Sequence, residues 1–327
     1  MPANLSPDYL EAEKQFKSAS TPEDKLAALR RMLSTIPKHK GTDKLQGDIK
    51  KRIAKLKQLV EAQVKKKGFS VTVEPEGAGQ LTVVGPPNSG KSALVRALTG
   101  VAVEVAPYPY STQRPAPAMM PYQDILVQLV DLPPVSSTHT ESWLPGIVRT
   151  SDGVLLVVDL ASADTLDEIE DCLGVLDQRK IRLVGEEPKS EAWASIAEKK
   201  TLFVGSKVDQ PGARESWSVL CELYGERFPG LVVSAESLEN VEELRTEIFR
   251  MLRVLRVYSK PPHREADRSR PFVLGEGSTL IDFARTVHHD FEDKLKFARV
   301  WGHGKFDGQR VNKDYPLSDG DVVELHL

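Results

Sequence analysis

A glycine-rich run with one lysine and one hydroxyl residue is the part of the sequence best equipped to bind phosphate. It has the form G-x-x-x-x-G-K-[ST] and consists of Gly85, Pro86, Pro87, Asn88, Ser89, Gly90, Lys91 and Ser92, followed by Ala93. The two glycines permit backbone angles that turn successive N–H groups toward phosphate oxygens. We expect Lys91 to neutralise the outer phosphates of a nucleotide and the Ser92 hydroxyl to ligate Mg²⁺.

A second polar run has residue types that could select the base of that nucleotide. It comprises Ser206, Lys207, Val208 and Asp209, directly after an apolar stretch. The Asp209 carboxylate can accept hydrogen bonds from N1–H and N2–H₂ of guanine, a donor pair that adenine lacks. The stem of Lys207 can lie over the base, and backbone contacts are expected from Ser234, Ala235 and Glu236. The two runs together predict binding of GTP or GDP and disfavour an ATPase.

Two further residues could act on Mg²⁺ and the γ-phosphate. Asp131 ends an apolar run and is expected to hold Mg²⁺ through water, as the aspartate of such sites does. Thr112 lies in the loop before that run, where its hydroxyl could close over the metal. We therefore assign catalytic roles to Lys91 and Thr112, with a plain loop threonine as the alternative for the second.

These residues must be positioned by a sheet whose strands end at one edge. Short apolar runs predict strands at Leu81–Val84, Ile125–Val130, Val154–Val158, Leu202–Val204 and Leu231–Val233. Helical patterns fit between them, at 91–99, 164–178, 213–225 and 239–255. This alternation predicts an α/β fold with a doubly wound, mainly parallel sheet, in which the loops at the carboxyl ends of the strands meet.

The chain is predicted to have three parts. Residues 1–68 read as a basic helical region, with a helix that starts at Thr21-Pro22 and a second from about Asp43 to Lys66. Residues 69–258 form the P-loop GTPase domain, and residues 259–327 form a small α+β domain. Between Lys38 and Lys67 there are 11 Lys/Arg and 3 Asp/Glu, so this segment either contacts an RNA backbone or is a solvated lysine face.

Composition limits the surroundings in which the protein would work. The net charge is −3, and no apolar run is long enough to span a bilayer. The polar first ten residues do not predict a signal peptide. Cys172 and Cys221 are expected to be buried free thiols in a reducing compartment. These features predict a cytoplasmic location without a membrane partner.

The order of the motifs GPPNSGKS, YPYST, DLPP, SKVD and SAE resembles that of Obg-type GTPases. The chain is most similar to the developmentally regulated GTP-binding subfamily, and Val300-Trp301-Gly302 and Asp319-Gly320-Asp321 fit its C-terminal TGS domain, a β-grasp unit. The resemblance implies a slow, Mg²⁺-dependent GTPase switch linked to the ribosome or to RNA. It also implies that Asn88 could ligate K⁺. Residues 263–327 are not strongly basic, so the 38–67 segment is the better candidate for phosphate contacts.

The sequence departs from that family at three places. An insertion of the GTPase domain is missing between Leu160 and Thr201. Ser206 replaces an asparagine, and its shorter side chain is expected to tie the base loop to the phosphate loop less firmly. Pro134 replaces the glycine whose N–H senses the γ-phosphate, and proline has no N–H. The alternative function is therefore a nucleotide-binding interaction module with little or no hydrolysis, unless another N–H such as that of Val135 takes over.

Overall fold

The structure is a computed structural model, in which the chain forms two compact units, Met1–Ser70 and Val71–Leu327. The residues that it describes are 14, 16, 22–35, 49, 51, 53, 71–100, 114–138, 140–188, 195–262, 264–288, 291, 295–302 and 306–326. Each unit is treated by itself.

The first unit contains helix α2 (Pro22–Thr35), which begins one residue after the predicted Thr21 start. The buried side chains of Leu29, Met32 and Ile49 form a small apolar cluster, against which Phe16, Leu33 and Ile53 pack. The spacing of Leu29, Met32 and Leu33 on one helix face explains why this face is buried. Most of the predicted basic segment 38–67 lies outside the described residues.

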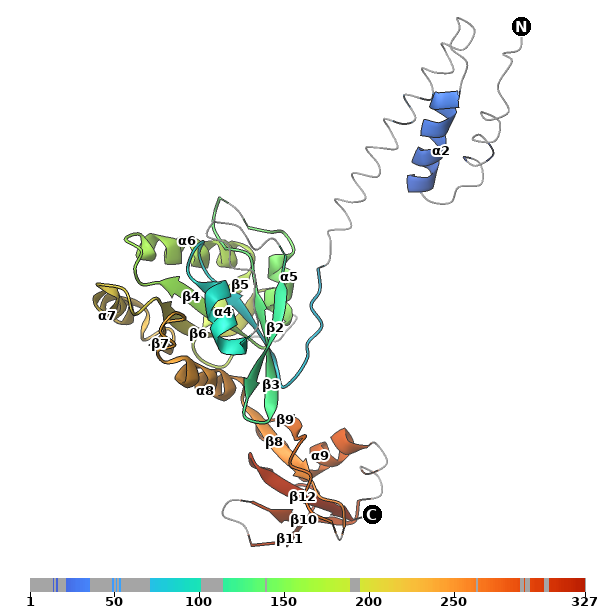
Figure 1. The fold of residues 1–327 in the computed structure, drawn as a ribbon. Helices are drawn as coiled ribbons and strands as arrows, with labels where there is room; N and C mark the ends of the chain where they lie inside the picture. The colour runs from blue at the N-terminus through green and yellow to red at the C-terminus, as the bar shows by residue number, and fades with distance from the viewer. Residues whose placement is uncertain are drawn as a thin grey trace, which may run out of the picture. The chain divides into compact units, whose positions relative to one another are not determined.

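The larger unit begins with a seven-stranded sheet of order β2-β3-β1-β4-β6-β5, with β7 beside β6 (Figure 1). Its strands are β1 (Gln80–Val84), β2 (Ala116–Tyr122), β3 (Ile125–Asp131), β4 (Gly153–Asp159), β5 (Ile181–Val184), β6 (Ala197–Ser206) and β7 (Gly230–Val232). All pairs are parallel except β2 with β3, which form an antiparallel hairpin. The predicted doubly wound, mainly parallel α/β sheet is confirmed.

Helices cover both faces of this sheet, as the near-continuous apolar strands require. The helices are α4 (Lys91–Thr99), α5 (Leu144–Thr150), α6 (Thr165–Gln178), α7 (Ala213–Tyr224) and α8 (Val241–Leu252). Helices α4 and α8 pack on the face that carries Leu81 and Val83. Helices α5, α6 and α7 pack on the opposite face, with Val84 and Leu156. Residues that alternate along one strand therefore serve two different cores.

A second, five-stranded sheet of order β11-β10-β12-β8-β9 follows. It consists of β8 (Val254–Ser259), β9 (Phe272–Gly275), β10 (Phe297–Trp301), β11 (Gln309–Val311) and β12 (Asp321–His326), with helix α9 (Leu280–Val287) on one face. The strand β8 is parallel to β12, and the other pairs are antiparallel. This mixed sheet with one helix agrees with the predicted β-grasp domain. The sheet begins at Val254, before the predicted boundary at residue 258.

The tip of the β2–β3 hairpin meets this second sheet. The guanidinium of Arg256 in β8 donates to Asp124 at 2.9 Å and to Asp319 at 2.7 Å, and it also contacts Gln123. The hydroxyl of Tyr258 bonds to the same Asp124 carboxylate. We call these five residues the junction cluster. They connect the seven-stranded sheet to the second sheet through paired charges.

The structure differs from the sequence-based expectations about local structure at several places. The helix predicted at 239–255 ends at Leu252, because Arg253 adopts a left-handed conformation and Val254 enters β8. Strand β2 was not predicted at all. Cys172 is buried as expected, but Cys221 is exposed on α7, so the prediction of a buried thiol was wrong there.

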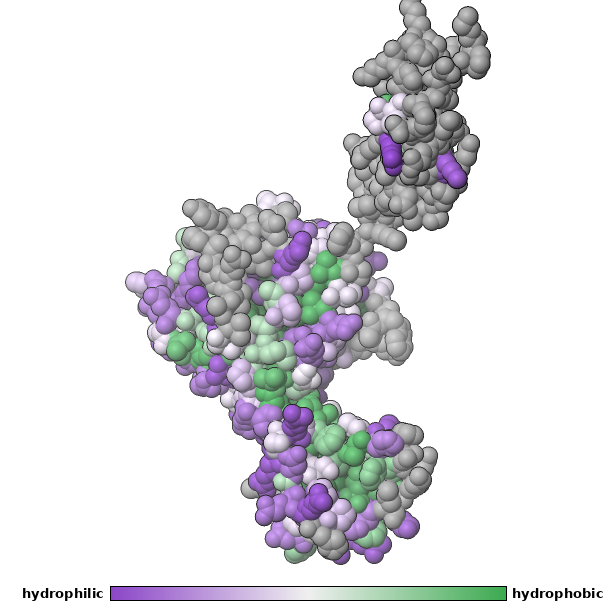
Figure 2. Space-filling model, turned by 45° about the vertical axis from the view of Figure 1, so that its right-hand side comes forward, coloured by the Kyte–Doolittle hydropathy of each residue, from purple (hydrophilic) through white to green (hydrophobic). Residues whose placement is uncertain are grey.

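The surface of the larger unit mixes hydrophilic and hydrophobic residues on the face shown in Figure 2. Within the described residues, no helix combines the length and the apolar character that crossing a membrane requires.

Candidate functional site

The phosphate loop connects β1 to α4, as its sequence predicts. An added Cβ at Gly85 would lie only 2.1 Å from the carbonyl oxygen of Val157, so the loop can pass β4 only with glycine there. Gly90 has a φ of 86°, a left-handed value that glycine adopts without strain. This conformation directs the chain into α4, whose first residues are Lys91 and Ser92. The first N–H groups of an α-helix have no partner within the helix, and such groups can bind phosphate.

Lys91 is folded onto the loop itself. Its Nζ donates to the carbonyl oxygens of Pro86 at 2.6 Å and Gly85 at 3.1 Å, and to Ser89 Oγ at 3.3 Å. The side chain is buried, and this burial lowers the pKa of Lys91 to about 8, although Asp131 opposes the shift. Carbonyls compensate a buried ammonium less well than an anion does. The lysine is therefore placed where phosphate oxygens would satisfy it better.

Asp131 and Ser92 form the predicted magnesium pair. The Ser92 hydroxyl donates to Asp131 Oδ2. The other oxygen, Oδ1, is buried and has no hydrogen-bond partner within the described part of the chain. Burial raises the pKa of Asp131, against the hydrogen bond from Ser92 and the charge of Lys91. A hydroxyl beside a carboxylate with one unsatisfied oxygen is a donor set that suits Mg²⁺.

A cavity of about 290 Å³ lies beside the phosphate loop, at the carboxyl ends of β6 and β7. Its lining joins the predicted base residues to the start of α4 and consists of Gly90, Ala93, Leu94, Arg96, Ser206, Lys207, Asp209, Gln210, Val233, Ser234, Ala235 and Glu236. Asp209 is exposed, and hydrogen bonds from Ser234 and Gln210 hold its pKa below the usual value. The carboxylate is therefore ionised at neutral pH and available as an acceptor.

The base loop is tied to the phosphate loop by Ser206. Its Oγ lies 2.8 Å from the carbonyl oxygen of Ser89 and 2.9 Å from that of Val158, so one hydroxyl proton is shared between two acceptors. The serine that replaces the asparagine therefore still links the base loop to the phosphate loop, although its side chain is shorter. Lys207 has a left-handed φ of 60° and pairs with Asp159 at 2.5 Å. This ion pair fixes the lysine at the cavity wall.

The segment after Asp131 has no backbone N–H left to donate. Leu132 N–H bonds to the carbonyl of Val83 at 3.3 Å, and Val135 N–H bonds to that of Gly85 at 3.1 Å. Ser136 N–H bonds to Thr140 Oγ1 at 3.2 Å and Ser137 N–H to Asp171 Oδ2 at 2.8 Å. Residues 133 and 134 are prolines without an N–H. The N–H of Val135 is therefore engaged with the phosphate loop.

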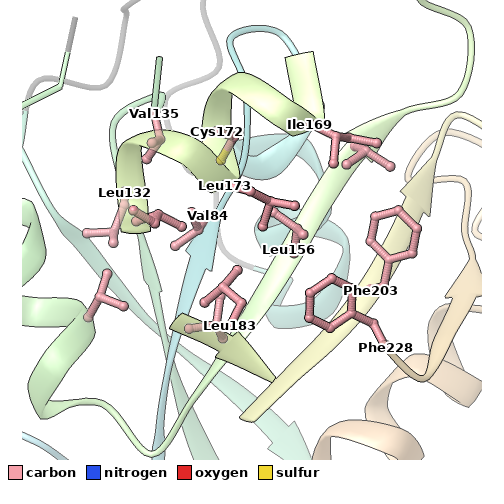
Figure 3. Close-up of a cluster of buried hydrophobic side chains, with 14 of the residues drawn as sticks. Val84, Leu132, Val135, Leu156, Ile169, Cys172, Leu173, Leu183, Phe203 and Phe228 are labelled. Carbon is pink, nitrogen blue, oxygen red and sulfur yellow. The ribbon is translucent and has the colours of Figure 1, made fainter. Parts of the chain in front are cut away.

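The same segment is packed into the core rather than held open. Leu132 and Val135 are fully buried beside Val84 and Cys172 (Figure 3). Pro133 and Pro134 are buried as well. Movement of this segment would expose apolar side chains, which makes it costly.

The structure brings most of the predicted site residues together, and it also adds residues that the sequence did not reveal. The predicted Thr112 lies outside the described residues. Asn88 is exposed at the tip of the phosphate loop with a φ of 60°. Asp159, Arg96 and Gln210 were not predicted. Only Asp159 had a signal, since it ends a strand as Asp131 does.

Family models match two parts of the chain. A model described as a 50S ribosome-binding GTPase matches residues 80–186, which run from β1 past β5. A model described as a TGS domain matches residues 255–327, which form the second sheet and α9.

Relatives match nearly the whole chain. A GTP-binding protein of Methanocaldococcus jannaschii is 24% identical over 93% of this chain and 92% of its own length. Developmentally-regulated G-protein 1 of Arabidopsis thaliana is 26% identical over 92% of this chain and 90% of its own length. A solved structure of a GTP binding protein from Pyrococcus horikoshii OT3 covers 76% of this chain and 99% of its own, with 16% identity and a TM-score of 0.49.

Proposed function

The chain belongs to the GTP-binding proteins that join a domain of the 50S ribosome-binding GTPase family to a C-terminal TGS domain, and we propose that it binds GTP and GDP with Mg²⁺ in the cavity beside its phosphate loop. The observation that carries this proposal is the common lining of that cavity. Its lining contains Asp209 and the Ser234–Glu236 loop together with Gly90 at the start of α4. A base and its phosphates require this juxtaposition.

Each side chain then has a defined role. Backbone N–H groups of the phosphate loop and the ammonium group of Lys91 would bind the phosphates. To do so, Lys91 must give up its hydrogen bonds to the carbonyl oxygens of the loop. Ser92 and Asp131, the latter through water, would hold Mg²⁺ together with Thr112. Bound Mg²⁺ would supply positive charge to the β- and γ-phosphate oxygens. Asp209 would select guanine, while the Lys207–Asp159 pair keeps the lysine stem along the base.

Calorimetric titration with GDP, ADP and XDP tests the choice of base. The parent protein should bind GDP far more tightly than ADP. Asp209→Asn should shift the preference toward XDP, because an amide can donate to the extra oxygen of xanthine. Asp177→Asn, at an exposed residue of α6 outside the cavity lining, is the matched control and should keep the preference for guanine. Equal affinity of the parent protein for GDP and ADP would contradict the proposed guanine site.

A second function, a nucleotide-dependent interaction module with little hydrolysis, is favoured by the segment after Asp131. Each N–H from Leu132 to Ser137 is either bonded within the protein or replaced by proline. A γ-phosphate therefore has no donor in this segment to draw toward itself. A ligand shifts a conformational equilibrium only through its differential interaction with the two states. Single-turnover GTP hydrolysis, measured with and without ribosomes, separates this function from that of a slow GTPase.

The proposed partner is the ribosome or an RNA, in the cytoplasm. The description of the matched GTPase family and the basic segment 38–67 support this proposal. Lysines that neutralise phosphates make affinity fall steeply with salt. Co-sedimentation with ribosomes at two salt concentrations tests it, and a bound fraction independent of nucleotide and salt would oppose it.

Potassium is proposed as an additional cofactor. The Asn88 side chain lies at the exposed tip of the phosphate loop, from which its oxygen could hold a monovalent cation against the phosphates. Turnover should be faster in KCl than in NaCl at equal ionic strength, and Asn88→Ala should abolish the difference. Identical rates of the parent in the two salts would exclude this role.

A further inference from the structure

Arg96 lies in the last turn of α4 and lines the cavity beside the phosphate loop. It follows Ala93 by about one helical turn, so both residues face the cavity from the same side of the helix. The Arg96 side chain is exposed and makes no hydrogen bond or ion pair with any residue that the structure describes. Its guanidinium is therefore available to a group inside the cavity.

The end of α4 does not need this arginine. The carbonyl oxygens of Ala97 and Leu98 accept from the guanidinium of Arg245 in α8, at 3.3 and 2.7 Å. The N–H of Gly100 bonds to the carbonyl oxygen of Arg96 at 2.9 Å and closes the helix. A basic side chain in the last turn often satisfies such carbonyls, but here another helix supplies it. Helix capping therefore does not account for an arginine at position 96.

Other side-chain donors in the cavity lining are already engaged. The hydroxyl of Ser206 donates to backbone carbonyl oxygens, and the ammonium of Lys207 is held in an ion pair. The amide of Gln210 donates to Asp209 Oδ2 at 2.7 Å. Arg96 thus differs from these three residues, because no described residue accepts from its guanidinium.

The loop after β7 adds few backbone donors to the cavity. The N–H groups of Glu236 and Ser237 both donate to Ser234 Oγ, at 3.2 and 3.0 Å. The N–H of Ala235 has no acceptor among the described residues, and it can serve one acceptor of a base. A base with two acceptors therefore needs a second donor.

Guanine has two such acceptors beside the groups that Asp209 is proposed to bind. Its O6 adjoins N1–H, and N7 lies on the same edge of the base as O6. An acceptor that is buried without a donor costs free energy, so a guanine site gains affinity from a donor to each. Arginine is the most common partner of O6 and N7, because its fork of N–H groups matches both. Adenine has an amino group in place of O6, and this group would oppose a guanidinium.

We propose that Arg96 is a second base-selecting residue, whose guanidinium donates to O6 and N7 of the guanine that Asp209 holds by N1–H and N2–H₂. This inference rests on the proposed nucleotide-binding function. The cavity of about 290 Å³ is small enough for residues of its different walls to contact one base. The Asp209 carboxylate and the Arg96 guanidinium then supply the acceptor and the donor that guanine requires on its neighbouring edges.

Calorimetric titration with GDP and 7-deaza-GDP tests the contact to N7. The analogue has a C–H group in place of N7 and the same charge as GDP. An effect of Arg96 on the phosphates therefore cancels in the ratio of the two affinities. The parent protein should bind GDP about tenfold more tightly than the analogue, the effect of one hydrogen bond from a charged group. Arg96→Met should bind the two nucleotides equally, because its side chain has no donor.

Two further variants separate the guanidinium contact from a general effect of substitution. Arg96→Lys should keep part of the preference for GDP, because an ammonium can also donate to N7. Arg182→Met is the matched control, since Arg182 is exposed on β5 and lies outside the cavity lining, and it should keep the full preference. Circular dichroism checks that each variant is folded.

The proposal would be overturned by a parent protein that does not distinguish GDP from 7-deaza-GDP, or by a preference that persists unchanged in Arg96→Met. In the second case, loss of the preference in Ser206→Ala would assign the contact to the Ser206 hydroxyl. The same titrations separate this inference from the function on which it rests. A parent that binds neither nucleotide contradicts the proposed function. A parent that prefers GDP to ADP but not to 7-deaza-GDP contradicts only the role of Arg96.

Discussion

The phosphate loop and the junction cluster both gather charged side chains, but they satisfy those charges differently. At the phosphate loop, Lys91 is buried against backbone carbonyls, and Asp131 Oδ1 is buried without a partner in the described residues. At the junction, Arg256 bonds to two carboxylates, Asp124 and Asp319, and its charge is paired.

This difference separates groups kept for a ligand from groups that hold the fold. A buried polar group without a good partner costs free energy, and a site keeps such a group only where a ligand supplies the partner. A paired cluster needs no ligand and contributes to stability in the free protein. Removal of a charge should therefore have opposite consequences at the two places.

The largest expected effect is the loss of nucleotide binding in Lys91→Met. Two charge-assisted contacts to phosphate would be lost, so GDP affinity should fall by about hundredfold or more. The nucleotide-free protein should unfold at the same temperature as the parent or higher, because a buried ammonium is replaced by an apolar chain of similar length. Calorimetry measures the first quantity and thermal unfolding without nucleotide the second.

Lys199→Met is the matched control, because Lys199 is a partly buried lysine away from the site. Burial also lowers the pKa of Lys199, and its Nζ donates to the carbonyl of Ser151 at 2.6 Å. GDP affinity should be unchanged in this variant. If the Lys91→Met variant kept its GDP affinity, Lys91 would have a structural role and would not be a group kept for a ligand.

Arg256→Met should have the opposite consequence. It leaves Asp124 and Asp319 without their cation and removes the contact with the Phe249 ring. We expect a loss of about 2 kcal/mol in unfolding free energy, because the guanidinium is largely buried, with unchanged GDP affinity. Urea denaturation provides the measurement.

Arg253→Met is the control for this junction variant. Arg253 pairs with Glu276 and Glu187 on the surface, where solvent screens the charges, so its loss should destabilise the fold much less than the loss of Arg256. Equal losses for the two variants would show that the paired cluster contributes no more than an ordinary surface ion pair.

Pro134→Gly tests whether the missing N–H at position 134 limits the response of the nucleotide site to the γ-phosphate. The substitution would create the one free N–H between Leu132 and Ser137, since the others are bonded inside the protein. The parent should bind a non-hydrolysable GTP analogue and GDP with similar affinity. The variant should prefer the analogue by about tenfold, the value of one additional hydrogen bond to a charged group.

Ser137→Gly is the control for loop flexibility. It loosens the same segment at an exposed position but adds no backbone N–H. If both variants gained the same preference for the GTP analogue, flexibility and not the missing N–H would be responsible. A parent that already prefers the analogue strongly would contradict the argument from Pro134.

Much of the nucleotide site could be predicted from sequence because each motif follows a strongly apolar strand. The phosphate loop after β1 and Asp131 at the end of β3 are examples, and the family resemblance was confirmed by the matched domains. Strand β2 was missed because Pro117 and Pro121 argue against a strand. Prolines are tolerated there because β2 lies at the edge of the sheet.

Other features depend on contacts that no local pattern encodes. Val254 and Leu255 continue the apolar character of α8, yet the left-handed Arg253 ends that helix. The bond from Val135 N–H to Gly85 joins residues that are distant in sequence. The pairing of Arg299 with Arg310 was also hidden, because residues 263–327 carry charges of both signs and only the sheet brings these two arginines opposite each other.

The smallest expected effect is the response of the junction cluster to acid. Burial alone would raise the pKa of Asp124, but hydrogen bonds from Tyr258 and Arg256 outweigh it, so the folded-state pKa lies below 3.8. A carboxyl with a lowered pKa stabilises the fold above its unfolded-state pKa and loses this contribution as the pH falls through the folded-state value. The parent should therefore lose part of its stability below about pH 4. Asp124→Asn keeps an acceptor for Tyr258 but cannot titrate, so its stability should be lower at pH 7 and should fall less on acidification. Urea denaturation of both proteins at a series of pH values measures this difference. Parallel curves would show that Asp124 is not electrostatically coupled to Arg256, and the junction would then be held by packing alone.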